Sequence, residues 1–211
     1  MKEKEKILKR ICVFCGSSPG ADAEYVRAAG KLARVLTAKN ICLVYGGGKV
    51  GMMGELASAM RDRGGKIIGV IPRDLAEKGV GFMELPDMRV VGSMHERKAL
   101  MAELSDGFIA LPGGLGTIEE IFEALTWAQL GIHRKPCGLL NVSGYYDQLI
   151  SFLDHAADQQ FIEPESRSML VIDEHPESLL EKFSAYQPPK VNKTEWALAM
   201  MKNTDAPPKG K

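Results

Sequence analysis

The sequence predicts an α/β fold, a single doubly wound, Rossmann-like domain whose parallel sheet of about seven strands is flanked by helices. Three observations support this prediction. The short apolar runs are continuous rather than alternating, which is typical of strands buried on both faces of a parallel sheet. Amphipathic stretches separate these runs, so strands alternate with helices and right-handed crossovers place helices on both faces. At 211 residues, the chain is long enough for one such domain and short for two.

The N-terminal half contains four apolar runs rich in Ile, Val and Leu, and three stretches in which apolar residues recur at helical spacing. The predicted strands are Ile11–Cys15, Ile41–Tyr45, Lys66–Ile71 and Met88–Val91, and the predicted helices are Asp22–Lys39, Gly51–Arg63 and Met94–Leu104. The segment Pro72–Asp87 shows no clear period, so we expect a loop over the ligand-binding edge of the sheet.

The C-terminal half repeats the alternation three times. The predicted strands are Gly107–Leu111, Cys137–Asn141 and Met169–Ile172, and the predicted helices are Thr117–Leu130, Tyr145–Gln159 and Pro176–Ser184. We therefore expect an N-terminal extension over 1–10, the Rossmann-like domain over 11–186, and a partly disordered tail over 187–211. Within this tail, Thr194–Met201 is compatible with a short helix.

Composition excludes several classes of protein. The formal net charge is zero, so nothing favours a nucleic acid or a membrane surface as partner. The N-terminus lacks the apolar core of a signal peptide, and no apolar run reaches membrane-spanning length, so we expect a cytoplasmic protein. Cys12 and Cys15 resemble a redox CxxC pair, but they lie in a predicted strand, where residues three apart point to opposite faces. Buried, reduced thiols are the favoured interpretation.

Three loops rich in small residues follow predicted strands, where ligands bind in open parallel sheets. The first is Gly16–Gly20, which carries two serine hydroxyls. The second, Gly46–Gly51, contains the pattern GxGxxG, but this signal is weak alone. The next strand ends in Ile71-Pro72-Arg73 instead of the ribose-binding acid, and Lys49 is followed by valine, unlike a Walker loop. A tight turn with packing glycines is the alternative.

The third loop, Pro112–Glu120, joins a buried strand to a helix. Such a glycine turn exposes backbone N–H groups to an anion, and the helix N-terminus adds partial positive charge. Glu119 and Glu120 would repel a phosphate lying directly on this turn, which suggests chemistry on a group attached to the phosphate. Simple complementarity to the helix dipole is the alternative, and the helical wheel does not choose between the two glutamates.

Arg97 lies near the centre of the apolar face of its predicted helix. An arginine there is costly unless an anion or a hydrogen-bonding partner meets it. Its place near the helix start puts it at the ligand-binding edge, so we favour an Arg97 that faces an anion. Snorkelling, with the stem packed and the head in water, is the alternative.

Several motifs occur together between about Ile11 and Phe183. Pro112–Glu120 fits the pattern PGGxGTxxE. The others are Ile11–Ser18, Val44–Gly48, Gly51–Gly54, Met94–Lys98 and Leu125–Gly131. In these motifs the sequence resembles the LONELY GUY (LOG) family, the cytokinin riboside 5′-monophosphate phosphoribohydrolases. Members are often labelled lysine decarboxylases, but no lysine here sits in a context typical of a pyridoxal phosphate site.

The resemblance implies hydrolysis of the N-glycosidic bond of a purine nucleoside 5′-monophosphate, of the cytokinin type or AMP, to free base and ribose 5-phosphate. It implies that Arg97 and Glu120 are the catalytic pair, and that the protein is a homodimer or higher homo-oligomer with sites near the subunit interface. With the loops above, it predicts these substrate-binding residues: Gly46, Gly47, Met94, Lys98, Gly113, Gly114, Leu115, Gly116, Thr117, Glu119 and Thr126.

The chemistry agrees with this assignment. Cleavage of the C1′–N9 bond passes through an oxocarbenium-like transition state, which a carboxylate stabilises. The pKa of an arginine is too high for a general acid, so Arg97 is expected to act electrostatically. Backbone N–H groups and the Thr117 hydroxyl would hold the phosphate. No Cys/His spacing suggests a metal site, and no metal or cofactor is expected.

Two other functions remain open at this point. One is a non-hydrolytic nucleotide-binding or molybdenum-cofactor carrier of the same fold, which the phosphate loops fit equally well. The other is a dinucleotide-dependent oxidoreductase, which the missing ribose acid disfavours.

The stretch Leu75–Glu84 does not align with the acidic stretch of LOG family members that act on cytokinin nucleotides, so the base of the substrate is not predicted.

Overall fold

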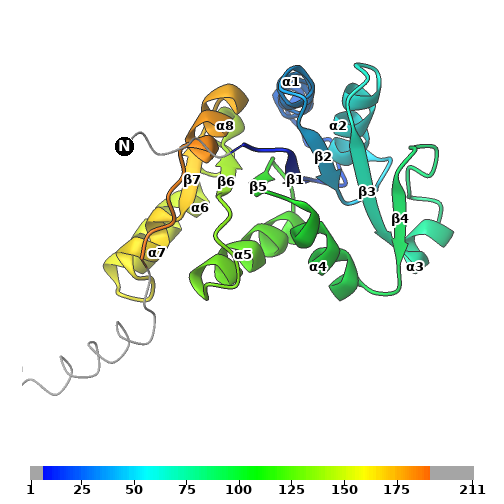
Figure 1. The fold of residues 1–211 in the computed structure, drawn as a ribbon. Helices are drawn as coiled ribbons and strands as arrows, with labels where there is room; N and C mark the ends of the chain where they lie inside the picture. The colour runs from blue at the N-terminus through cyan, green and yellow to red at the C-terminus, as the bar shows by residue number, and fades with distance from the viewer. Residues whose placement is uncertain (1–6, 191–211) are drawn as a thin grey trace, which may run out of the picture.

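The computed structural model describes residues 7–190 and has the predicted α/β architecture (Figure 1). One sheet contains seven parallel strands in the order β4-β3-β2-β1-β5-β6-β7. The strands are β1 Arg10–Phe14, β2 Cys42–Tyr45, β3 Ile67–Pro72, β4 Met88–Val91, β5 Gly107–Ala110, β6 Cys137–Leu140 and β7 Leu170–Asp173. The helices are α1 Ala23–Ala38, α2 Gly51–Arg61, α3 Arg73–Glu77, α4 Met94–Leu104, α5 Leu115–Gln129, α6 Asp147–Asp158, α7 Pro164–Ser168 and α8 Pro176–Ser184, with a 3₁₀ turn at Val142–Gly144.

Helices cover both faces of the sheet, as Figure 1 shows. On one face α1, α2 and α8 form one core, in which Leu32, Leu56 and Leu179 are fully buried. On the other face α4, α5 and α6 form the second core, centred on Met101 and Ile121. Because both faces are covered, the strands have the continuous apolar sequences from which they were predicted.

The strand order places a topological switch point beside β1, which pairs with β2 on one side and with β5 on the other. Ligands of open α/β sheets bind in the crevice outside the carboxyl ends of the strands at such a point. Here the loop after β1 begins at Cys15-Gly16, and the loop after β5 contains Pro112–Gly114. The backbone N–H of Gly16 donates to the carbonyl of Pro112 at 3.1 Å, so these two loops lie side by side.

Two short helices were not predicted. The expected loop Pro72–Asp87 contains α3, and α7 begins with Pro164 before β7. Both have five residues; α3 buries none and α7 buries only Ser166, so neither leaves an apolar period in the sequence. Helix α5 begins at Leu115 rather than at Thr117, so part of the glycine turn is the first turn of the helix. The predicted tail helix Thr194–Met201 lies outside the described residues.

The cysteine interpretation is confirmed. Cys12 belongs to the core beneath α4 and α5, whereas Cys15 belongs to the core beneath α1 and α2, and both thiols are free. Burial raises the pKa of both thiols, which keeps them protonated. In the described part of the chain, no helix is long and apolar enough to cross a membrane.

Candidate active site

A cavity of about 420 Å³ lies at the switch point, between the carboxyl ends of the central strands and the starts of α4 and α5. Its polar lining includes Ser17, Arg97, Thr117 and Glu120, and much of the remainder is apolar. The full lining is Cys15, Gly16, Ser17, Gly46, Gly48, Val50, Met53, Ile71, Leu75, Val80, Met94, Arg97, Gly114, Leu115, Gly116, Thr117 and Glu120. The structure therefore brings Arg97, Glu120 and the glycine turn into one cavity.

Arg97 and Glu120 form an ion pair between α4 and α5. Nη1 of Arg97 lies 2.5 Å from Oε1 of Glu120, and the two side chains are 10% and 11% exposed. Nε of Arg97 donates to the Val70 carbonyl at 3.1 Å, and Nη1 also contacts the Met94 sulfur at 3.4 Å. Arg97 is therefore not a snorkelling side chain, because its charged head is buried and paired with a carboxylate.

Burial raises the pKa of the Glu120 carboxyl above its ordinary value, although the charge of Arg97 and its hydrogen bond oppose that effect. Such a group titrates closer to neutrality than a surface glutamate. A carboxylate with a raised pKa beside a fixed cation, in a cavity, is an arrangement typical of catalytic sites.

The start of α5 is open to an anion. Within residues 7–190, no acceptor is found for the backbone N–H groups of Leu115, Gly116 and Thr117, and the first N–H bonded in this turn is that of Ile118, to the Gly114 carbonyl. The three residues that carry these groups line the cavity. Free N–H groups and the helix dipole together make a site for a phosphate.

The start of α2, after the GxGxxG loop, is closed instead. The N–H of Met53 donates to the Gly16 carbonyl at 3.3 Å, that of Met52 to the Ser18 carbonyl at 3.4 Å, and that of Lys49 to the Val80 carbonyl at 2.9 Å. Gly51 has φ +59°, and a Cβ there would collide with the Ser17 carbonyl. Gly51 thus allows close packing on the β1 loop, and the N–H groups of Lys49, Met52 and Met53 are occupied by carbonyls of neighbouring loops.

Two tyrosines that were not predicted hold the glycine turn. The hydroxyl of Tyr145 donates to the Gly113 carbonyl at 2.6 Å, and that of Tyr146 donates to the Leu111 carbonyl at 2.7 Å. Both tyrosines follow β6 and reach the turn across 32 and 35 residues of sequence. A pair of adjacent tyrosines gives no periodic or motif signal, so only the fold reveals this contact.

Lys98, Glu119 and Thr126 do not line the cavity. Nζ of Lys98 contacts Glu119 at 2.6 Å and Glu123 at 3.0 Å. Burial lowers the pKa of Lys98, but these two hydrogen bonds outweigh it and the pKa is raised. Thr126 donates to the Phe122 carbonyl and lines a separate hollow of about 190 Å³ beside α7.

Four of the five predicted glycines line one or both of two adjoining hollows. Gly46, Gly114 and Gly116 line the cavity, whereas Gly47 does not. Gly113 lines an adjoining hollow of about 250 Å³, which shares Gly16, Ser17 and Gly114 with the cavity. The glycine turn therefore forms the boundary between these two spaces.

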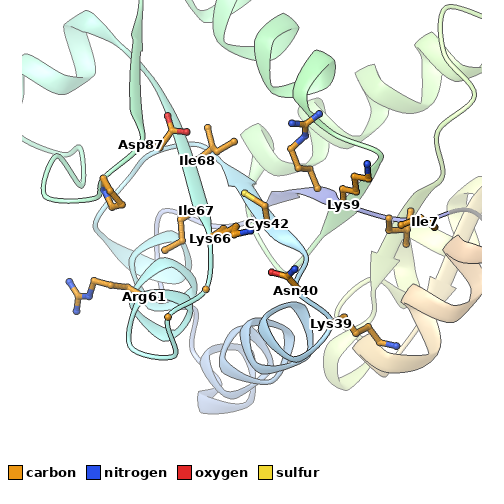
Figure 2. A pocket seen from close by; sticks show the side chains of 15 residues that line it. Ile7, Lys9, Lys39, Asn40, Cys42, Arg61, Lys66, Ile67, Ile68 and Asp87 are labelled. Carbon is orange, nitrogen blue, oxygen red and sulfur yellow. The ribbon is translucent and has the colours of Figure 1, made fainter.

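A further hollow, of about 930 Å³, lies at the opposite edge of the sheet and contains none of the predicted site residues. It is lined by cations, including Lys39, Arg61 and Lys66, near the C-termini of α1 and α2. Figure 2 shows Arg61 and Lys39 at opposite sides of this hollow with their charged ends pointing apart. Cations at helix C-termini complement the helix dipole, and Arg61 and Lys39 do not converge on one ligand here.

No cluster of three or more His, Cys, Asp or Glu residues suited to a metal ion is found in the described part of the chain. The cavity, as the described residues line it, also has no lysine, the residue that holds pyridoxal phosphate as a Schiff base.

Comparison with known proteins adds independent findings. A family model described as "Possible lysine decarboxylase" matches residues 53–183. The chain is 50% identical over 196 residues to the rice protein "Probable cytokinin riboside 5′-monophosphate phosphoribohydrolase LOGL6", covering 92% of this chain and 78% of that one. It is 47% identical over 188 residues to "Cytokinin riboside 5′-monophosphate phosphoribohydrolase LOG7" of Arabidopsis thaliana, covering 89% and 87%.

Solved structures share the fold at lower identity. The molybdenum cofactor binding protein of Rippkaea orientalis superposes with a TM-score of 0.64 at 23% identity, covering 88% of this chain and 98% of that one. The molybdenum cofactor carrier protein of Chlamydomonas reinhardtii superposes with a TM-score of 0.61 at 19% identity, covering 84% and 99%. At these identities the likeness concerns the fold alone.

Proposed function

This chain belongs to the LOG family of cytokinin riboside 5′-monophosphate phosphoribohydrolases, and from that premise we propose how its own residues carry out the reaction. The protein is an enzyme that hydrolyses the N-glycosidic bond of a purine nucleoside 5′-monophosphate to free base and ribose 5-phosphate. The observation that most supports this assignment is the buried Arg97–Glu120 pair, which shares a cavity with the open N-terminus of α5.

The 5′-phosphate binds at the start of α5. The unbonded N–H groups of Leu115, Gly116 and Thr117 and the buried Thr117 hydroxyl are its donors. A phosphate there gains from the helix dipole, and no cation is needed to hold it. Glu120 lies on the same helix, one turn further, so a bound nucleotide has its sugar near the carboxylate.

Glu120 acts on the sugar. The C1′–N9 bond breaks with its electron pair leaving on the base, and the carboxylate stabilises the positive charge that develops on the ribose. A water molecule adds to C1′ and gives its proton to Glu120, and the base finally takes up a proton. Arg97 holds Glu120 in place and offsets negative charge on the leaving base; a guanidinium group stays protonated in proteins and does not act as a general acid.

The base lies against the apolar part of the cavity. This part of the cavity is lined by four aliphatic side chains, those of Val50, Ile71, Leu75 and Val80. Such a wall accepts a purine ring, and it accommodates an apolar N6 substituent more readily than a polar one.

The test is incubation of the purified protein with AMP and with N6-isopentenyl-AMP, followed by chromatographic detection of free base and ribose 5-phosphate. Release of both products in equal amounts supports the proposal, and the ratio of the two kcat/KM values gives the base preference. Tight nucleotide binding without any release of base would contradict it and would favour a carrier.

The same proposal includes a homodimer or higher homo-oligomer in the cytoplasm, with the nucleotide as its only ligand. Apolar side chains are exposed near α5, namely Leu115 at 88%, Leu130 at 55% and Phe161 at 84%. Thr126 lies on the exposed side of α5, where a second copy would meet it. Sedimentation equilibrium tests this part, and a monomer at micromolar concentration would contradict it.

A further inference from the structure

Gly46 follows β2 and contacts the guanidinium group of Arg97. A Cβ built on Gly46 would collide with Nη2 of Arg97, and Met53 Sδ would lie 3.3 Å from it. The φ of Gly46 is outside the left-handed region, in contrast to φ +73° at the neighbouring Gly47. The backbone at Gly46 is therefore one that any residue can adopt. What glycine supplies at this position is space.

Arg97 cannot move out of this space without losing one of its other contacts. Its Nε is bound to the Val70 carbonyl at 3.1 Å, and its Nη1 is paired with Glu120. The guanidinium group is planar and rigid, so fixing Nε and Nη1 also fixes Nη2. In that orientation Nη2 lies where a side chain of residue 46 would begin.

We propose that Gly46 is a positioning residue: the space left by its missing side chain holds the Nη2 end of Arg97, and so keeps the guanidinium group in the orientation that pairs with Glu120. Gly46 then acts on the reaction through Arg97 and need not touch the nucleotide. This inference rests on the proposed function only in so far as Arg97 and Glu120 carry the chemistry.

Gly46→Ala is expected to lower the activity of the enzyme much more than the stability of its fold. The atom that a Cβ would meet belongs to the end of the Arg97 side chain and not to the backbone, so the displacement costs the contacts of one ion pair and leaves the packing of the core intact. Gly46→Ala is therefore expected to leave the protein folded, with Arg97 displaced from Glu120. Displacements of about 1 Å at a catalytic group cost about 10²-fold in rate.

The decisive measurement is made on the resting enzyme and needs no substrate. The carboxyl carbon of Glu120 is followed by ¹³C NMR against pH, its signal assigned by loss in Glu120→Gln. Because the charge of Arg97 lowers the pKa of this carboxyl, Gly46→Ala is expected to raise that pKa above its wild-type value. In an Arg97→Lys background, where no Nη2 branch exists, the same substitution is expected to cause no shift.

Kinetics and a matched control complete the test. Gly46→Ala is expected to lower kcat on the preferred nucleotide about 10²-fold with little change in KM, and to move the acid limb of the pH profile upward. Gly30→Ala, in the middle of α1 with no atom within 4 Å of the added Cβ, is expected to match the wild type.

Three results would overturn the proposal. One is a Glu120 pKa unaffected by Gly46→Ala, and another is an equal shift in the wild-type and Arg97→Lys backgrounds. The third is a Gly46→Ala protein that is unfolded at room temperature, since the added Cβ would then disrupt the packing of the protein and not only the position of Arg97. If the wild type releases no base, the proposed function fails, but the NMR titration still decides whether Gly46 positions Arg97.

Discussion

Replacing Glu120 by glutamine is expected to lower kcat/KM by about 10³-fold. The glutamine keeps the shape of the side chain and an oxygen that can accept from Arg97, but it removes the charge. The Glu120 side chain is 11% exposed, so an effective dielectric constant of about 20 applies rather than that of water. A sugar cation about 4 Å from the carboxylate then loses about 4 kcal/mol of stabilisation, which corresponds to about 10³-fold in rate.

The assay is the initial rate of base release at saturating and at limiting nucleotide, after circular dichroism has shown that each variant is folded. This check matters because the substitution leaves the buried Arg97 charge without its carboxylate, which costs about 3–5 kcal/mol of stability. Glu120→Asp keeps the charge but withdraws it by one methylene, and an intermediate loss is expected.

The control is Glu123→Gln, which is the same substitution on the same helix. Glu123 pairs with Lys98 and does not line the cavity, so this variant is expected to keep near wild-type activity. The reasoning would be refuted by a Glu120→Gln enzyme that works within tenfold of the wild type, or by an equal loss in Glu123→Gln.

Three further predictions follow from the same geometry. Because burial raises the pKa of Glu120, kcat/KM is expected to fall on acidification with a midpoint above about 4.3, the ordinary glutamate value; a rate profile with its midpoint at or below that value would contradict this. Tyr145→Phe removes the hydrogen bond to the Gly113 carbonyl and is expected to raise KM about fivefold with kcat little changed, so an unchanged KM in steady-state kinetics would show that the turn holds its shape alone. Burial raises the pKa of Asp173, but hydrogen bonds from Lys182, Ser178 and the His175 N–H lower it to about 2; since this folded-state pKa lies below the unfolded one, the stabilisation is present above about pH 4 and is lost as the pH falls toward 2. Asp173→Asn is therefore expected to cost about 1–2 kcal/mol at pH 7 and almost nothing near pH 2, and urea unfolding at both pH values checks it.

The fold was predictable because the apolar patterns that drive its formation are local features of the sequence. Each buried strand is a short apolar run, and helices such as Met94–Leu104 and Pro176–Ser184 begin and end where their sequence pattern does. The short helix α3 was missed because it buries no side chain, and hydrophobic periodicity cannot report an element that contributes nothing to a core.

The candidate site was partly predictable for a different reason. The carboxyl ends of parallel strands meet at one edge, so loops far apart in sequence could be placed together before the structure was known. The choice between Glu119 and Glu120 could not be made from the helical wheel, because both lie off the core face. It depended on α4, which places Lys98 opposite Glu119 and Arg97 opposite Glu120.

The two glycine turns show most clearly what sequence composition leaves open. The turns after β2 and β5 both lead into a helix, and by composition either could bind a phosphate. They differ in the acceptors around them: carbonyls of Gly16, Ser18 and Val80 accept from the N–H groups of Met53, Met52 and Lys49 in and just before the first turn of α2. The tyrosine hydroxyls beside the β5 turn bind carbonyls instead and leave the N–H groups of α5 available. The acceptors beside the β2 turn and the donors beside the β5 turn therefore favour α5 as the phosphate site that we propose, and the space at Gly46 favours the positioning role that we propose for that residue.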